Sequence, residues 1–301
     1  MVGSALVRRL VAQDYRRLLT PSRPELDLRD AGAVDRYFAV EKPEYVFMIA
    51  AKVGGIAANA ADPVGFIDDN LTMTLSLFHA AHRHGVRKSL FLGSSCIYPQ
   101  ACPQPMREEH LLTGPLEPTN EAYAIAKIAG IKLADAYFRQ HGFLTVCPMP
   151  CNIYGTNDHF DLEKSHVLSA LVRRFVDAVD GDADEVTLWG SGAARREFIH
   201  VEDVTTAIVL LMDRCDTPDI VNVGTGTDIS IAELATMIAR EAGYRGRIAW
   251  DRSKPDGMPR KRLDVSRITR LGFVPSIGLE EGIRLTVREY RALMREGGAT
   301  A

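Results

Sequence analysis

Three residues with complementary chemistry stand out in the sequence: Ser94, Tyr123 and Lys127. Tyr123 and Lys127 are four positions apart, so on a helix they share one face, where the lysine's charge is expected to lower the tyrosine pKa. A tyrosine of lowered pKa can exchange a proton with a carbonyl oxygen. Ser94 follows an apolar run typical of a buried parallel strand, and such strands carry active-site residues at their carboxyl ends. This combination indicates hydride transfer to a ketone.

The spacing of Tyr123 and Lys127 is weak evidence alone, because exposed helices carry the same pair by chance. Two further features favour the catalytic interpretation. Ser94 lies in a Gly93-Ser94-Ser95 strand end, and Asn120 precedes the helix as a candidate N-cap. The combination resembles the extended short-chain dehydrogenase/reductase family.

The composition is typical of a soluble enzyme of one or two domains, with 301 residues, 46% of them hydrophobic, and a net charge of -3. The near-neutral charge and the lack of a long basic run argue against a nucleic-acid partner, and no apolar stretch is long enough to span a membrane. Arginines interrupt the N-terminal segment, which is unlike a signal peptide and indicates a cytoplasmic protein. Five cysteines without a Cys-x-x-Cys pair predict neither a metal site nor a disulfide framework.

Apolar runs alternate with helical stretches along the first half of the chain, which predicts an α/β fold with a Rossmann-like, doubly wound parallel sheet. Residues 1–150 are expected to form the first domain, and residues 151–301 a smaller lobe from which some chain returns to the first domain. Strands are predicted at 17–20, 45–50, 88–93 and 144–149, and helices at 4–13, 31–40, 63–84, 120–140, 165–180 and 231–241.

The N-terminus is typical of the middle of a dinucleotide-binding unit. Such a unit begins with a strand, then a glycine-rich turn, then a helix whose N-terminus faces the pyrophosphate. Met1-Val2-Gly3 followed by an amphipathic helix matches only the last glycine and the helix. We therefore expect the first strand to be missing from the chain and Met1 not to be the natural start. An ordinary N-terminal helix is the alternative.

The region after the second predicted strand indicates which cofactor is used. An acidic residue there would bind the ribose of NAD, but the sequence offers Arg23, whose forked guanidinium suits a 2'-phosphate. NADPH is therefore favoured over NADH, with a solvated loop arginine as the alternative. Asp27 is a candidate adenine contact. Gly54-Gly55 would let the backbone approach the cofactor, or would form a plain tight turn.

Several motifs distributed over nearly the whole chain resemble the GDP-L-fucose synthase family. Members of that family epimerise GDP-4-keto-6-deoxy-D-mannose at C3 and C5 and then reduce C4 with NADPH, and the fold family implies a homodimer. The resemblance implies an NADP-binding first domain and a nucleotide-sugar-binding second lobe. The motifs are residues 51–56, 93–99, 117–121, 123–131, 189–192, 196–198 and 254–257.

The resemblance also implies a role for each matching residue. Ser94, Tyr123 and Lys127 match the reductase triad, whereas Cys96 and His166 match the acid and base of epimerisation. The substrate contacts would be Arg174, Trp189, Arg196 and Asp256. The cofactor contacts would be Gly3, Arg23, Asp27, Leu92, Gly93, Lys127, Pro150, Asn152, Ile153 and His166.

The chemistry explains why a thiol and an imidazole would be needed. The hydrogens on C3 and C5 lie next to the C4 ketone, so removing either gives an enolate that Tyr123 and Ser94 can stabilise by donation. Inversion then needs a proton from the opposite face, and cysteine and histidine, the residue types at Cys96 and His166, are better suited to this than serine or lysine. Which of them is the base stays open. A buried inert thiol and a satisfied loop histidine are the alternatives.

Two other functions are consistent with the fold: a 4-epimerase or dehydratase acting on a nucleotide sugar, and a non-catalytic NADP-binding regulator. The presence of both Cys96 and His166 argues against the first, and the complete triad argues against the second. Trp189 would stack on guanine or simply pack. Cys151 stands where the family commonly has threonine.

Overall fold

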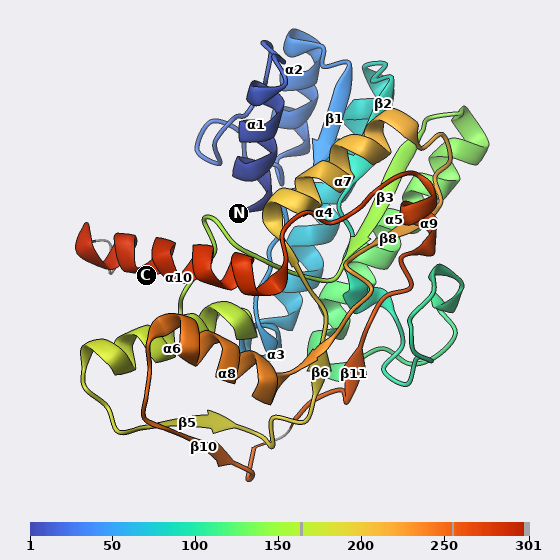
Figure 1. Ribbon diagram of the computed structural model, residues 1–301. Coiled ribbons are helices and arrows are strands. Elements are labelled where there is room, and N and C mark those ends of the chain that lie inside the picture. The colour runs from blue at the N-terminus through green and yellow to red at the C-terminus, as the bar shows by residue number, and fades with distance from the viewer. Residues whose placement is uncertain (163–164, 255, 298–301) are drawn as a thin grey trace.

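A four-stranded parallel sheet forms the centre of the molecule (Figure 1), in a computed structural model that describes residues 1–162, 165–254 and 256–297. Helical crossovers between successive strands make the pairing parallel. The strands β2 and β3 are buried along their whole length, including their polar residues Lys88, Ser89 and Thr145. The sheet order is β1-β2-β3-β8, where the strands are β1 (Tyr45–Met48), β2 (Lys88–Phe91), β3 (Thr145–Pro150) and β8 (Ile220–Val223).

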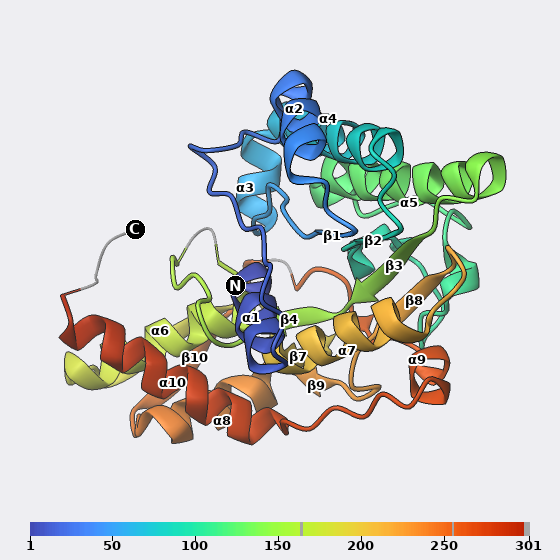
Figure 2. The same cartoon turned by 90° about the horizontal axis from the view of Figure 1, so that it is seen from above.

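Helices cover both faces of this sheet (Figure 2), as a doubly wound fold requires. One face carries α2 (Ala31–Glu41), α4 (Pro63–Arg83) and α5 (Glu121–His141), and the other carries α1 (Val2–Ala12) and α7 (Val201–Arg214). The helix α1 is held to α7 by Arg8, which pairs with Glu202 at 2.7 Å, and by Arg9, whose Nε donates to Thr205 at 2.8 Å. The predicted Rossmann-like fold is confirmed.

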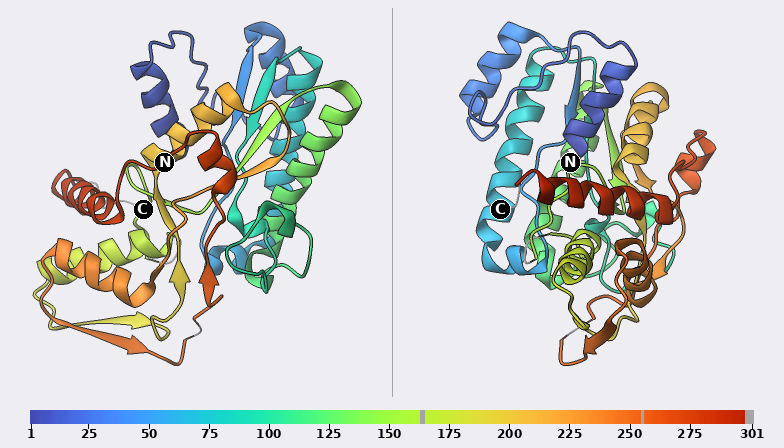
Figure 3. Two further views of the ribbon diagram at one scale, coloured as in Figure 1. Left: turned by 45° about the vertical axis from the view of Figure 1, so that its right-hand side comes forward. Right: turned by 60° about the vertical axis from the view of Figure 1, so that its left-hand side comes forward.

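The second half of the chain builds a separate lobe beneath the sheet (Figure 3). Three amphipathic helices pack around a second apolar core that includes Phe175, Leu234 and Ile283. The first core also contains residues between 199 and 273, so chain from the second half returns to the sheet. The elements of the lobe are α6 (Val167–Asp180), α8 (Ile231–Ala242), α10 (Leu279–Arg295), the pair β5 (Glu185–Trp189) and β10 (Arg247–Asp251), and the set β11 (Arg260–Lys261), β6 (Arg195–Arg196) and β9 (Ile229–Ser230).

Local sequence signals explain where several helices begin and end. Asp30 accepts the Ala33 N–H at the start of α2, and Ser230 with Glu233 forms a capping box at the start of α8. Gly142, with φ 70°, adopts the left-handed conformation that ends α5. The remaining elements are α3 (Ile56–Ala61), α9 (Ser266–Arg270), the parallel pair β4 (Asn152–Tyr154) and β7 (Phe198–His200), and short 3-10 turns at 95–97, 108–110 and 118–120.

The structure differs from the sequence-based expectation in three places. The prediction of a strand at 17–20 is wrong. That segment is not a strand in the structure, because no neighbouring strand is present with which it could form a ladder. Asn120 does precede α5, but its side chain makes no capping bond and its Oδ1 is buried without a partner. Two helices were expected after Pro150, whereas α7, α9 and α10 are also present.

Candidate active site

Ser94 and Cys96 lie where the chain leaves the carboxyl end of β2. After Phe91 the backbone passes through Leu92 and Gly93 into the 3-10 turn Ser95–Ile97. A Cβ at Gly93 would meet the flexible end of the Met149 side chain of β3 and would lie 3.1 Å from the Pro148 carbonyl oxygen, so the space around this glycine is tight. The Ser94 Oγ accepts the Cys96 N–H at 3.2 Å, which leaves the serine hydroxyl proton free to be donated elsewhere.

The helix α5 brings Tyr123 and Lys127 to the same edge of the sheet. Lys127 is buried, and its Nζ donates to the Leu92 carbonyl oxygen at 2.7 Å. The same Nζ lies 5.8 Å from the centroid of the Tyr123 ring. Gly130 of α5 has no room for a Cβ against the Phe91 ring, which shows how closely the helix packs on β2. Ser94, Tyr123 and Lys127 are therefore brought together.

The electrostatics of the triad differ from the sequence-based expectation. Burial raises the pKa of Tyr123, a negative charge at Cys96 would raise it further, and the Ser94 side chain lowers it only in part. Burial also lowers the pKa of Lys127 to about 8. The expectation that Lys127 lowers the tyrosine pKa is therefore wrong here. Tyr123 is a protonated phenol, which is the form that can donate a proton.

The two candidate epimerisation residues have different surroundings. Cys96 is half-buried and close enough to Tyr123 to influence its pKa. His166 is exposed at the N-cap of α6, where its backbone oxygen accepts the Ala170 N–H at 3.0 Å. Within the described part of the chain, no hydrogen bond joins His166 to Cys96. The structure thus brings Cys96 to the triad, and the pairing with His166 stays a prediction.

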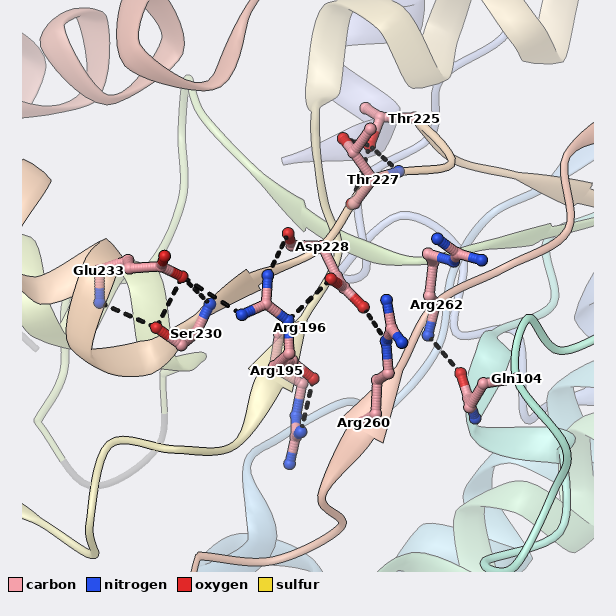
Figure 4. Close-up of polar contacts among 10 residues, drawn as sticks. All are labelled: Gln104, Arg195, Arg196, Thr225, Thr227, Asp228, Ser230, Glu233, Arg260 and Arg262. Atoms are coloured by element: carbon pink, nitrogen blue, oxygen red, sulfur yellow. Dashed lines mark hydrogen bonds and ion pairs between the residues drawn. The ribbon is translucent and has the colours of Figure 1, made fainter.

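Four arginines lie on the neighbouring strands β6 and β11 and just beyond (Figure 4). Asp228, whose side chain is 4% exposed, lies between Arg195 and Arg260. Its Oδ1 accepts from Arg195 Nε at 2.9 Å, and its other oxygen pairs with Arg260. Both guanidinium groups therefore have an internal counter-charge.

Arg196 differs from these two, because its guanidinium is bonded only to backbone oxygens. Its Nη1 donates to the carbonyls of Arg195 at 2.8 Å and Met258 at 2.6 Å. No carboxylate among the described residues lies within ion-pair distance of it. Burial lowers the pKa of Arg196, since a half-buried cation loses hydration. An anionic ligand would supply the missing counter-charge.

The other proposed substrate contacts lie in the second lobe. Trp189 is 68% exposed, and the Lys254 ammonium lies 5.6 Å from its ring centroid, so this ring is not part of a packed core. Asp256 is exposed and accepts both the backbone N–H and the hydroxyl of Ser191 at 2.6 Å. Arg174 is half-buried on α6. Pro255, in the motif next to Asp256, lies outside the described residues.

The predicted cofactor contacts fall into two groups. Arg23, Asp27 and Gly3 line a cavity of about 1890 Å³ beside β1. Asp27 is engaged by Arg29 at 2.7 Å, which holds its pKa well below the usual range, whereas Arg23 is exposed. Gly3 lies in the first turn of α1, and a Cβ there would meet nothing, so crowding does not require this glycine.

The second group lies at the carboxyl ends of β2 and β3 and in β4. Leu92 and Gly93 follow β2, and Pro150 ends β3. Asn152 and Ile153 are in β4, where the Asn152 amide donates to the Glu197 carbonyl oxygen at 2.7 Å. The Asn152 side-chain amide is therefore already hydrogen-bonded within the protein, to the backbone of β6–β7 at Glu197.

Sequence reasoning missed Asp228, Arg260 and the role of Glu197. Glu197 is 1% exposed, and its carboxylate accepts the backbone N–H groups of Leu263 at 2.6 Å and Gly226 at 2.7 Å. It thereby fixes the segments on either side of Arg196, although burial raises its pKa. The run Arg196-Glu197-Phe198 could have indicated this role of Glu197, since an acidic side chain that is buried next to apolar residues needs buried hydrogen-bond partners.

Among residues 1–162, 165–254 and 256–297, no group of histidine, cysteine, aspartate or glutamate side chains is arranged to hold a metal ion. Within the same ranges, no helix is both long and apolar enough to cross a membrane.

Comparison with known proteins gives consistent matches. Residues 1–224 match the model of the NAD dependent epimerase/dehydratase family. The chain is 51% identical over 290 residues to putative GDP-L-fucose synthase 2 of Arabidopsis thaliana, which covers 96% of this chain and 88% of the relative. It is 48% identical over 299 residues to GDP-L-fucose synthase of Escherichia coli K12, and this match covers 96% of this chain and 93% of the relative.

A solved structure of a GDP-mannoheptose C4 reductase from Campylobacter jejuni with NADP bound is similar over 96% of this chain and 95% of its own, with a TM-score of 0.89 and 33% identity. These likenesses extend over nearly the whole chain. The chain belongs to the NAD dependent epimerase/dehydratase family and, within it, to the GDP-L-fucose synthases.

Proposed function

We propose that the protein converts GDP-4-keto-6-deoxy-D-mannose to GDP-L-fucose, by epimerisation at C3 and C5 followed by NADPH-dependent reduction at C4. The observation that carries this proposal is the meeting of Ser94, Cys96 and the Tyr123–Lys127 pair at the carboxyl end of β2. The named activity of the relatives at 48% to 51% identity supports it.

The triad would act first on the ketone oxygen. Tyr123 and Ser94 donate to the C4 oxygen, and this stabilises the enolate that forms when a proton leaves C3 or C5. Cys96 and His166 remove and return those protons on opposite faces of the sugar. In the reduction step Tyr123, as a protonated phenol, gives its proton to the C4 oxygen. Lys127 orients the site through its bond to Leu92.

The residues present fit NADPH. Bound NADPH supplies the hydride that reduces C4. The Arg23 guanidinium is exposed on the cavity beside β1, where it can pair with the 2'-phosphate, and Asp27 is already neutralised by Arg29. Gly93 permits close approach of the backbone at the carboxyl end of β2. Gly3, Leu92, Pro150, Asn152, Ile153 and His166 complete the proposed cofactor contacts.

Replacing Arg23 by alanine is expected to weaken NADPH binding about tenfold or more and to leave NADH binding unchanged, because only NADPH carries the 2'-phosphate. Fluorescence titration of both cofactors measures this. Arg16→Ala is the matched control, since Arg16 is an exposed arginine paired with Asp14. Equal weakening of both cofactors by Arg23→Ala would show that Arg23 only supports its loop.

Replacing Arg196 by methionine is expected to weaken GDP binding about 10- to 100-fold, because a charge-assisted contact to the diphosphate would be lost. Calorimetric titration with GDP measures the change. Arg173→Met is the control, because Arg173 pairs with Asp177 of its own helix. Unchanged GDP affinity in the Arg196 variant would exclude the diphosphate contact. Arg174, Trp189 and Asp256 would hold the rest of the GDP-sugar.

The same proposal covers the organisation of the chain. Residues 1–150 would bind NADP, and residues 151–301 would bind the nucleotide sugar. The part of the second half that returns to the sheet would support the NADP-binding domain. A homodimer would form through α4 and α5, where Leu75 is 42% exposed and lines a groove of about 280 Å³, and where Ile125 is 38% exposed. All five cysteines are free thiols, which supports a cytoplasmic location.

The proposed activity is tested by supplying the protein with GDP-4-keto-6-deoxy-D-mannose and NADPH and identifying the product by NMR. GDP-L-fucose is the expected product. A sugar that is reduced at C4 without inversion at C3 and C5 would indicate a C4 reductase alone, which is the activity named for the Campylobacter jejuni neighbour.

A further inference from the structure

Arg29 links two carboxylates in the cavity beside β1. Its Nη2 donates to Asp27 Oδ2 at 2.7 Å and its Nε donates to Asp27 Oδ1 at 3.0 Å, so this ion pair is bidentate. Its Nη1 donates to Asp69 Oδ1 at 3.2 Å, and Asp69 belongs to α4. All three residues line the cavity proposed as the cofactor site. Arg29 is therefore bonded to Asp27 on one side and anchored to α4 on the other.

The charge of Asp69 is balanced by a second cation. Lys52 Nζ donates to Asp69 Oδ2 at 3.2 Å and to Asp62 Oδ2 at 2.6 Å. Asp62 is in turn the N-cap of α4, where the helix dipole favours a negative charge. Because Lys52 compensates Asp69, the positive charge of Arg29 stays available to Asp27.

The charge of Asp27 matters because Arg23 lies near it. Hydrogen bonds from Arg29 hold the pKa of Asp27 well below its usual range, and the charge of Arg23 lowers this pKa further. Arg23 is the residue proposed to bind the 2'-phosphate of NADPH. An unpaired carboxylate beside it would repel that phosphate, whereas NADH, which has a hydroxyl there, would be little affected. The ion pair of Asp27 with Arg29 has no net charge.

We propose that Arg29 determines the choice of NADPH over NADH. It cancels the charge of Asp27, so that Arg23 can bind a 2'-phosphate beside a carboxylate that would otherwise repel it. Arg23 then supplies the attraction, and Arg29 removes the opposing repulsion. This inference rests on the proposed NADPH site and deepens it, because it adds a second arginine to the selection of the cofactor.

The test measures the dissociation constants of NADPH and NADH by fluorescence titration and compares their ratio. Both cofactors carry the adenine that Asp27 is expected to contact, so any loss of that contact cancels in the ratio. The variants are Arg29→Met and the double variant Arg29→Met/Asp27→Asn. Arg16→Met is the matched control, since Arg16 makes a bidentate pair with Asp14, also two residues earlier, and both lie outside the cavity lining.

Arg29→Met is expected to reduce the preference for NADPH about tenfold, through weaker NADPH binding, because the unpaired Asp27 carboxylate then acts on the 2'-phosphate. Adding Asp27→Asn is expected to restore most of the preference. A merely structural role of Arg29 would not give this recovery, because the second substitution removes a charge and replaces no contact of the arginine. Arg16→Met is expected to leave the ratio unchanged.

An unchanged or increased preference for NADPH after Arg29→Met would overturn the proposal, and so would the lack of recovery in the double variant. In either case the NADPH site itself would stand, provided that the unmodified protein prefers NADPH. If the unmodified protein binds neither cofactor or prefers NADH, the proposed cofactor site is wrong and the role of Arg29 is refuted with it.

Discussion

Replacing Tyr123 by phenylalanine is expected to slow reduction at C4 about 100-fold or more, the usual scale for losing a positioned acid. The variant keeps the ring beside Lys127 but has no proton to give to the C4 oxygen. NADPH binding is expected to be unchanged. The rate of NADPH oxidation in the presence of the keto-sugar measures the first effect, and fluorescence titration measures the second.

Tyr137→Phe is the matched control, because Tyr137 lies on the same helix and packs against Phe78 and His82 away from the triad. Its reduction rate is expected to equal that of the unmodified protein. Reduction at the normal rate by the Tyr123 variant would contradict the assignment of the proton donor. A simultaneous loss of reduction and NADPH affinity would show that the hydroxyl acts in binding.

Replacing Cys96 by serine is expected to slow proton exchange at C3 and C5 about 100-fold or more, because serine is a much weaker acid than cysteine. The backbone should be preserved, since the Cys96 N–H still bonds to Ser94. The readout is the initial rate at which substrate hydrogens are replaced by solvent deuterium without NADPH. NADPH affinity is expected to be unchanged.

Cys215→Ser serves as the control, because this buried thiol donates only to the Thr217 carbonyl oxygen, which a serine hydroxyl can also reach. Normal exchange is expected for it. If the Cys96 variant exchanges both positions at the normal rate, Cys96 is not the epimerisation acid or base. His166→Asn, assayed in the same way, tests the partner.

The sequence predicted the parts of the fold that depend on local patterns. The apolar runs of β2 and β3 and the amphipathic helices α4 and α5 were recognised within a few residues of their bounds. The meeting of Ser94 with Tyr123 and Lys127 was also predicted, because it depends only on helical spacing and on the carboxyl edge of a parallel sheet.

Properties that depend on long-range packing were not predicted. Burial raises the pKa of Tyr123, and Lys127 does not offset this effect. The Lys127 ammonium instead donates a hydrogen bond to the Leu92 carbonyl oxygen. The segment 17–20 has strand-forming residues but no neighbouring ladder. The bonds of Asp228 to Arg195 and Arg260 join residues far apart in the sequence, and no local pattern reveals them.

The most direct test of the proposed reaction is to convert unlabelled GDP-4-keto-6-deoxy-D-mannose with NADPH in deuterium oxide. If both centres are deprotonated and reprotonated before reduction, the product is GDP-L-fucose that carries solvent deuterium at C3 and at C5. NMR of the purified product shows each position separately. A product reduced at C4 that keeps its original hydrogen at C3 and C5 would contradict the account.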